Sequence, residues 1–214
     1  MIALSRTALL IFLLLGAGCG QEPSSEVPAS SAPRPKAAGA PGSVLVAYWT
    51  KNGNTKALAE TVAEGAREIE GTDVVLKAMS DVTAEDLARC DGLALGSATH
   101  FANLPGEAKT ILDRWSYEWQ VDFTDKVGGA FATGGDVTGG KEHVVVSLLL
   151  YMLSNRMILA GPLHGEGPRS WGEMGASATT GEVSRGVQDE ERQSARKLGH
   201  RLADLAMRIS RGDK

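Results

Sequence analysis

Residues 44–55 read VLVAYWTKNGNT, and this stretch decides the fold of the chain. Its first part, 44–48, is a nearly unbroken apolar run, which is typical of a parallel strand covered on both faces. Its second part, 50–55, is a turn of small polar residues. An amphipathic helix is predicted to begin at Thr55, because apolar residues then recur at helical spacing. Strand, tight polar loop and helix together form a geometry that can bind a phosphate group.

The loop at 50–55 has the chemistry of a phosphate site. Backbone N–H groups in the loop and at the start of the helix are expected to point at one spot, where the helix dipole favours negative charge. Gly53 allows a close approach of the backbone, and the polar side chains can add hydrogen bonds. The residues predicted to hold the phosphate are Thr50, Lys51, Asn52, Gly53, Asn54 and Thr55. The alternative is an ordinary polar turn between a strand and a helix.

Two common phosphate-binding motifs do not match this loop. It lacks the G-x-x-x-x-G-K-[ST] pattern of ATPase P-loops and the G-x-G-x-x-G pattern of Rossmann dinucleotide sites. It resembles the T-x-T-G-x-T loop of flavodoxins, which holds the phosphate of FMN, with Asn52 in place of the middle threonine. The resemblance implies that FMN is the cofactor.

Composition and charge limit the possible functions. The chain has 214 residues, of which 43% are hydrophobic, enough for one domain with a core plus extra segments. The formal net charge of -4 gives no reason to expect a nucleic-acid partner. Its two cysteines, Cys19 and Cys90, cannot form a disulfide framework or a CxxC motif. We find no spacing of metal ligands, no paired carboxylates and no Ser/His/Asp set, so neither a metal nor a catalytic side chain is predicted.

The N-terminal 42 residues are predicted to lie outside the folded domain. Residues 1–18 contain an apolar run that is too short to span a bilayer but suits a signal peptide. The small residues directly before Cys19 resemble a bacterial lipoprotein box, which implies that Cys19 is lipidated and anchors the protein to a membrane of the cell envelope. Residues 19–42 are rich in Pro, Ala and Ser and are predicted to be a disordered tether. An uncleaved signal anchor with an incidental cysteine is the alternative.

Strands and helices alternate through residues 43–214, the predicted folded domain. The predicted strands are 44–48, 73–79, 92–97, 127–132 and 157–160; the predicted helices begin at Thr55, Val82, Pro105, Glu142 and Asp189, and 161–187 is predicted to be a long glycine-rich loop. This alternation predicts an α/β fold with a doubly wound, five-stranded parallel sheet and helices on both faces. Ligands bind such sheets beyond the carboxyl ends of the strands, so the loops after the first, third and fourth strands should form one site.

Two of those loops carry a wider resemblance. Residues 97–105 read SATHFANLP, residues 133–140 read TGGDVTGG, and neither looks like a hairpin turn. Over 43–209 the chain resembles the flavodoxin-like NAD(P)H:quinone oxidoreductases, also called the tryptophan-repressor-binding-protein family. The family's P-T-R-F-G-N segment corresponds to 98–103 and its T-G-x-G-G-G-type loop to 133–140. Its L-D pair and later tryptophan correspond to 112–113 and Trp119.

The resemblance implies roles for these segments in binding FMN. The residues that would frame the isoalloxazine ring are Ala98, Thr99, His100, Phe101, Asn103, Thr133, Gly134, Gly135 and Asp136. Trp119 would cover the flavin, often from a neighbouring subunit. Phe101 can stack on the ring or equally fill the core. His100 and Ala102 depart from the family's arginine and glycine, and 155–156 is Asn-Arg where the family often has two histidines.

Three functions remain open at this point. The first is an FMN-dependent NAD(P)H:quinone oxidoreductase, which the resemblance implies to be a homodimer or homotetramer. The second is a flavodoxin-type electron carrier, and the third is a flavin-free scaffold. The lipoprotein signal predicts a location on the periplasmic or extracellular face of a membrane. Quinones are expected nearby in that location, whereas NAD(P)H is not.

Overall fold

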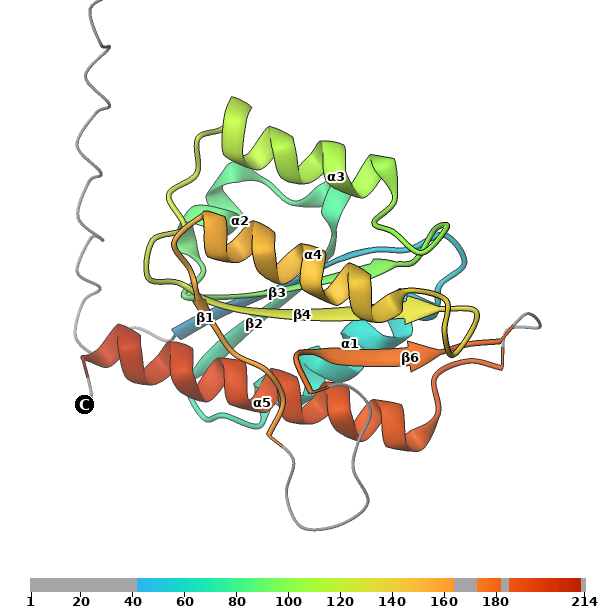
Figure 1. Cartoon of the computed structure of the whole chain (residues 1–214). Coiled ribbons are helices and arrows are strands. Elements are labelled where there is room, and N and C mark those ends of the chain that lie inside the picture. The colour runs from blue at the N-terminus through green and yellow to red at the C-terminus, as the bar shows by residue number, and fades with distance from the viewer. Residues whose placement is uncertain (1–41, 164–172, 182–184, 213–214) are drawn as a thin grey trace, which may run out of the picture. The chain divides into compact units, whose positions relative to one another are not determined.

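The computed structural model describes residues 42–163, 173–181 and 185–212 (Figure 1). The predicted signal peptide, Cys19 and nearly all of the predicted tether lie outside these residues. No helix in the described part of the chain combines the length and the apolar character needed to cross a bilayer.

A parallel sheet forms the centre of the fold, in the order β2-β1-β3-β4-β5. The strands are β1 (Gly42–Trp49), β2 (Thr72–Ala78), β3 (Gly92–Ala98), β4 (Val127–Gly134), β5 (Ile158–Leu159) and β6 (Ala176–Thr179). This order confirms the predicted doubly wound sheet and places the change of direction between β1 and β3. Every strand pair is parallel, so all the strands end at the same edge.

The fifth position of the sheet is shared by two short strands. β5 pairs with the start of β4, at Val127 and Gly128, and β6 pairs with its end, at 131–134. The prediction that 161–187 is entirely loop was therefore wrong, because 176–179 is a strand. That segment reads ASAT, without the large β-branched or aromatic residues that signal a strand, and it is a strand because β4 pairs with it.

Helices cover both faces of the sheet, as predicted. They are α1 (Asn54–Arg67), α2 (Ala84–Arg89), α3 (Gly106–Asp113), α4 (Lys141–Ser154) and α5 (Asp189–Arg211), with short turns η1 (Met79–Asp81) and η2 (Arg114–Glu118). α1 and α5 pack on one face and α2, α3 and α4 on the other (Figure 1). A hydrophobic core lies on each face of the sheet, and alternate residues of β1 belong to each core. Val44 and Val46 pack toward α1 and α5, while Leu45 and Ala47 pack toward the other helices.

The contact between α1 and α5 fixes where α1 points. A Cβ added at Gly65 would lie 2.0 Å from the carbonyl oxygen of Arg196, and one added at Gly199 would lie 1.9 Å from that of Val62. Both distances are far below any real contact, so the two backbones approach as closely as glycine permits. Because α1 begins at the predicted phosphate loop, this packing also holds that loop against the sheet.

Candidate functional site

The loop after β1 leaves the start of α1 open to an anion. Gly53 precedes the helix with a left-handed φ of 91°, and its N–H donates to the Thr50 hydroxyl at 3.0 Å. No acidic residue lies in the first turn of α1. The first N–H groups of a helix have no carbonyl within the helix to bond, and together they carry the positive end of the dipole. Lys51 and Asn52 are exposed beside them.

Thr55 connects this loop to β4. Its side chain is fully buried, and its hydroxyl lies 2.8 Å from the hydroxyl of Thr133, at the end of β4. The structure thus brings together two predicted site residues that are 78 positions apart in the sequence. The hydroxyl of Thr55 faces the protein interior, so its contribution here is to fix α1 against the sheet.

Thr99, after β3, places an unpaired hydroxyl in the same region. Its N–H donates to the carbonyl of Thr133 at 2.8 Å, which aligns the two loops. Its hydroxyl is buried and has no hydrogen-bond partner among the described residues. The same oxygen lies 3.6 Å from the position that a Cβ would take at Gly134. A buried hydroxyl without a partner is costly, so a polar ligand atom at this point would relieve the cost.

Residues 100–103 form a two-residue hairpin turn, which corrects the prediction that this loop contains none. His100 and Asn103 exchange two backbone hydrogen bonds, of 3.0 and 2.9 Å. Phe101 and Ala102 at its tip have φ values of 48° and 60°. Such a turn normally carries Gly or Asn, so the sequence gives no signal for it. Phe101 is fully exposed, which excludes the alternative that it fills the core.

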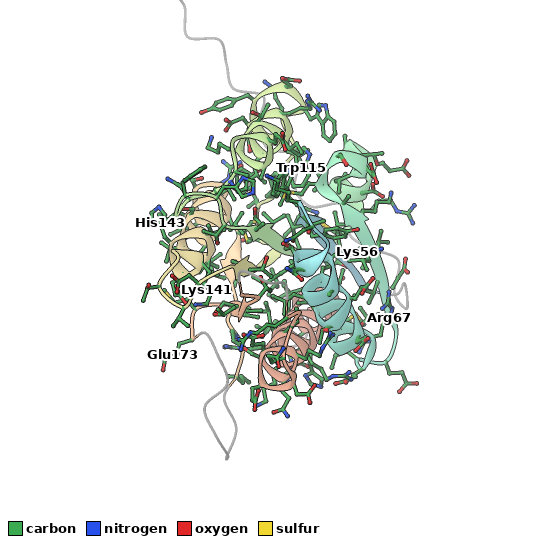
Figure 2. All side chains as sticks on the ribbon, turned by 90° about the vertical axis from the view of Figure 1, so that its right-hand side faces the viewer. Lys56, Arg67, Trp115, Lys141, His143 and Glu173 are labelled. Carbon is green, nitrogen blue, oxygen red and sulfur yellow. The ribbon has the colours of Figure 1, made fainter. Side chains whose placement is uncertain are left out.

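The loop after β4 packs against this hairpin. A Cβ added at Gly140 would lie 2.6 Å from the Cα of Ala102, so only glycine allows the two loops to meet. Residues 135–138 are exposed and present the backbone of the loop to solvent. The loops after β1, β3 and β4 therefore converge at one edge of the sheet, as predicted. Figure 2 views the molecule from this side.

The comparisons with known proteins agree with this geometry. The model of the NADPH-dependent FMN reductase family matches residues 43–164. This chain belongs to that family. Its fold is flavodoxin-like, and its cofactor is FMN.

Relatives of this FMN reductase family member have two kinds of name. A flavodoxin from Aquifex aeolicus is 36% identical over 163 residues, which cover 76% of this chain and 86% of the relative. An NAD(P)H dehydrogenase (quinone) from Gluconacetobacter diazotrophicus is 30% identical over 196 residues, covering 78% and 98%. The crystal structure of a flavodoxin, WrbA-like protein from Agrobacterium tumefaciens has a TM-score of 0.61 at 23% identity, covering 78% and 98%. The last likeness concerns the fold alone.

The residues of this family member fit the parts of FMN. The start of α1 offers backbone donors and an uncompensated dipole for the phosphate. A Cβ added at Gly53 would meet nothing within 4 Å, so a side chain would not clash with the protein there. Glycine is needed at this position because its φ of 91° is strained for other residues. The hydroxyl of Thr99 and the backbones of 98–103 and 134–138 are the groups that would contact the ring.

Three residues beside this candidate FMN site were not predicted from the sequence. Thr180, just after β6, donates to the carbonyl of Gly134 from both its N–H, at 2.8 Å, and its hydroxyl, at 3.3 Å. Arg185 donates from Nε to the carbonyl of Thr179 at 2.7 Å. Lys141 lies buried at the start of α4. The first two depend on β6, which the sequence does not signal, and the burial of Lys141 follows from the packing of α4.

Trp119 does not lie at the candidate FMN site of its own chain. It follows η2, and α3 and η2 run back from the carboxyl edge of the sheet toward the edge where β4 begins (Figure 1). Its side chain packs against the core on the α3 and α4 face. A contact with flavin would therefore have to be made in a neighbouring subunit, as the resemblance implies. Residues 174–176 lead into β6, where a Cβ added at Gly175 would lie 2.3 Å from the carbonyl oxygen of Ala130.

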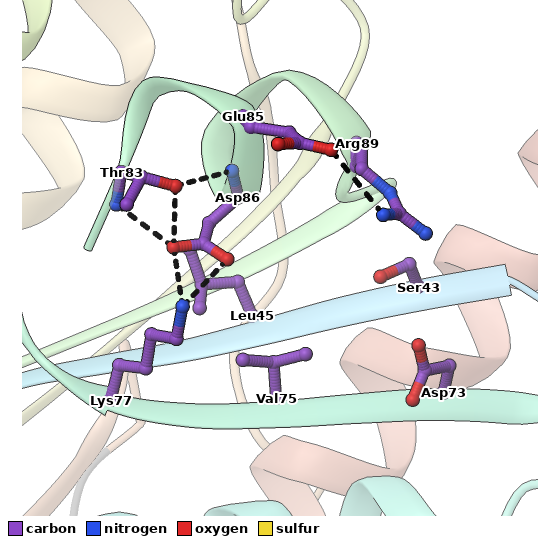
Figure 3. A pocket seen from close by; sticks show the side chains of 9 residues that line it. All are labelled: Ser43, Leu45, Asp73, Val75, Lys77, Thr83, Glu85, Asp86 and Arg89. Carbon is purple, nitrogen blue, oxygen red and sulfur yellow. Dashed lines mark hydrogen bonds and ion pairs between the residues drawn. The ribbon is translucent and has the colours of Figure 1, made fainter. Parts of the chain in front are cut away.

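A separate polar hollow of about 320 Å³ lies between β1, β2 and α2 (Figure 3). Four of its charged groups form two pairs: Lys77 contacts both carboxylate oxygens of Asp86, at 2.8 and 2.7 Å, and Arg89 lies 3.5 Å from Glu85. Asp86 also accepts from the N–H of Thr83 at 2.8 Å, completing the cap of α2. Burial raises the pKa of Asp86, but hydrogen bonds from Lys77 and Thr83 outweigh it and lower the pKa overall. This hollow is a structural feature of the α2 cap.

Proposed function

We propose that this protein is an FMN-dependent NAD(P)H:quinone oxidoreductase. The observation that carries the proposal is the convergence of three strand-end loops on Thr133, next to the buried, unpaired hydroxyl of Thr99. The family match supports a role for NADPH as the electron donor, and the relative named NAD(P)H dehydrogenase (quinone) supports a quinone as the acceptor.

The side chains and backbone of the site act by binding and orientation. Backbone N–H groups at the start of α1 would hold the phosphate, with the exposed Lys51 adding positive charge. Thr99 and the loop after β4 would fix the ring. Bound FMN would supply the two-electron redox chemistry between NAD(P)H and a quinone. Phe101 stands in solvent on the adjacent turn and can pack against a flat aromatic substrate.

The test combines binding with turnover. Purified protein is titrated with FMN, and the loaded protein is then mixed with NADH or NADPH and a benzoquinone. We expect a yellow protein and rapid oxidation of the nicotinamide that depends on both FMN and quinone. FMN binding without such turnover would contradict the oxidoreductase proposal while leaving the cofactor assignment intact.

A matched pair of variants tests the site itself. Thr99→Val removes the unpaired hydroxyl and keeps the branched shape, so we expect FMN to bind about tenfold more weakly, the value of roughly one good hydrogen bond. The stability of the FMN-free protein should not fall, because this hydroxyl has no protein partner to lose. Thr110→Val, at an exposed position of α3, is the control. Equal FMN affinity in both variants would remove Thr99 from the site.

A flavodoxin-type electron carrier is the second candidate. The 36% identity to the Aquifex aeolicus flavodoxin favours it. Stepwise titration with dithionite distinguishes the two functions by absorbance. Stable accumulation of one-electron-reduced flavin, together with no oxidation of NAD(P)H, would favour the carrier.

We also propose that Cys19 is lipidated and anchors an assembled protein to the cell envelope. The small residues before Cys19 support the anchor, and the placement of Trp119 away from its own FMN site supports a contribution from a second subunit. Labelled palmitate should enter the wild type but not Cys19→Ala, which should also leave the membrane fraction. Light scattering of the FMN-loaded protein should give a dimer or tetramer; a monomer would contradict the assembly.

A further inference from the structure

Lys141 carries a buried positive charge beside the FMN site. It is the first residue of α4, and only 4% of its surface is exposed. Its Nζ donates to the carbonyl of Val137 at 2.8 Å, within the loop after β4. Its second partner is the carboxylate of Glu142 at 2.9 Å, on a side chain that is 57% exposed. Figure 2 labels Lys141 at the start of α4, on the side of the molecule where the strands end.

This position is unfavourable for a cation. Burial removes hydration from the ammonium, and the start of a helix is the positive end of its dipole. One carbonyl and one largely solvated carboxylate compensate only part of this cost, because the charge of Glu142 is screened by water. The surroundings of Lys141 therefore favour an additional negative charge nearby.

The lysine stem borders the groups that would contact the flavin ring. The Cβ of Lys141 lies 3.4 Å from the position that a Cβ would take at Gly134, and the Thr99 hydroxyl lies 3.6 Å from the same point. The phosphate, by contrast, is assigned to the start of a different helix, α1. Lys141 is thus placed with the ring-binding loops and not with the phosphate loop.

We propose that Lys141 raises the reduction potential of bound FMN by stabilising the negative charge that the isoalloxazine ring gains when it is reduced. The inference rests on the FMN site and is independent of quinone activity. A unit charge in partly buried surroundings acts over several ångströms with much less screening than in water. Lys141 is therefore a residue that sets the potential, in addition to holding the loop through Val137.

The test compares the midpoint potential of FMN in the wild type, Lys141→Gln and Lys109→Gln. Lys109 is an exposed lysine of α3, paired within its own helix, and serves as the matched control. In Lys141→Gln, we expect the ratio of dissociation constants for reduced and oxidised FMN to rise at least tenfold, which lowers the two-electron potential by about 30 mV. Lys109→Gln should leave the potential unchanged.

An unchanged potential in Lys141→Gln would overturn the proposal, because a lysine that only anchors the loop would weaken both redox forms of FMN equally. If Lys141→Gln does not bind FMN, the potential is measured in Glu142→Gln instead. Removing the compensating carboxylate should lower the same ratio about threefold, raising the potential by about 14 mV; no change there would equally overturn the proposal. If the wild-type protein binds no FMN, both the FMN site and the role of Lys141 are overturned. If it binds FMN but the potential does not depend on Lys141, only the role of Lys141 is overturned.

Discussion

Gly199→Ala should destabilise the protein through the contact between α1 and α5. The added Cβ would lie 1.9 Å from the carbonyl oxygen of Val62 and 3.0 Å from the N of Ala66. These atoms belong to the backbone of α1, so no side chain can rotate away, and the helices must separate by about 1 Å. Alanine gains about 1 kcal/mol of helix propensity over glycine. Overpacking of this kind typically costs 1–3 kcal/mol, and separating two helix backbones falls at the upper end.

The net expectation for Gly199→Ala is a loss of about 1–2 kcal/mol, or about 2–8 °C in Tm for a domain of this size. Gly106→Ala, at the start of α3, is the control, because its added Cβ meets nothing within 4 Å. Urea denaturation with matched m-values measures both variants. Since α1 begins at the phosphate loop, Gly199→Ala should also weaken FMN binding, although it lies far along α5. Equal stability of the two variants would refute the idea that close backbone packing positions α1.

Three further predictions concern the site and the core. Thr55→Val should cost about 1–3 kcal/mol in urea denaturation, because it leaves the buried Thr133 hydroxyl without its 2.8 Å partner; wild-type stability would contradict that bond. Gly53→Val combined with Thr55→Ala should lower FMN affinity at least tenfold, since a branched residue is strained at a φ of 91°; an unchanged FMN titration would remove the phosphate-loop assignment. Burial raises the pKa of Tyr151 to about 12, helped by the charge of Asp113. The folded state thus holds this proton more tightly than the unfolded state, so stability should fall as pH rises from about 10 to about 12. Tyr151→Phe should flatten that part of the pH profile.

Buried hydrogen bonds explain why Tyr151 is a useful reporter. Its hydroxyl lies 2.9 Å from the hydroxyl of Ser116 and donates to the carbonyl of Leu112 at 3.2 Å. Both partners lie on the α3 and η2 segment, so the tyrosine links α4 to it. A loss of this link on ionisation would loosen the face of the sheet opposite α1 and α5.

Local patterns in the sequence were sufficient for the framework of this protein. The apolar run at 44–48, the polar loop at 50–55 and the helical spacing after it depend on neighbours in the chain, and each formed as predicted. The alternation of strands and helices then leaves few ways to cover both faces of a parallel sheet. It also requires the loops after β1, β3 and β4 to meet at one edge, so the place of the candidate FMN site in the fold could be predicted.

The tertiary structure alone decided what depends on contacts between distant residues. The segment 176–179 is a strand because β4 pairs with it, and the turn at 100–103 adopts left-handed φ values while Gly140 packs closely against its tip. The burial of Lys141 and the hydrogen bond between Thr55 and Thr133 likewise depend on elements that are far apart in the sequence, so no local sequence pattern predicts them. A sequence pattern indicates the periodicity of a helix or strand and the conformational preferences of its residues. The partners of buried hydroxyls and the burial of charged groups are set by how the helices and strands pack together.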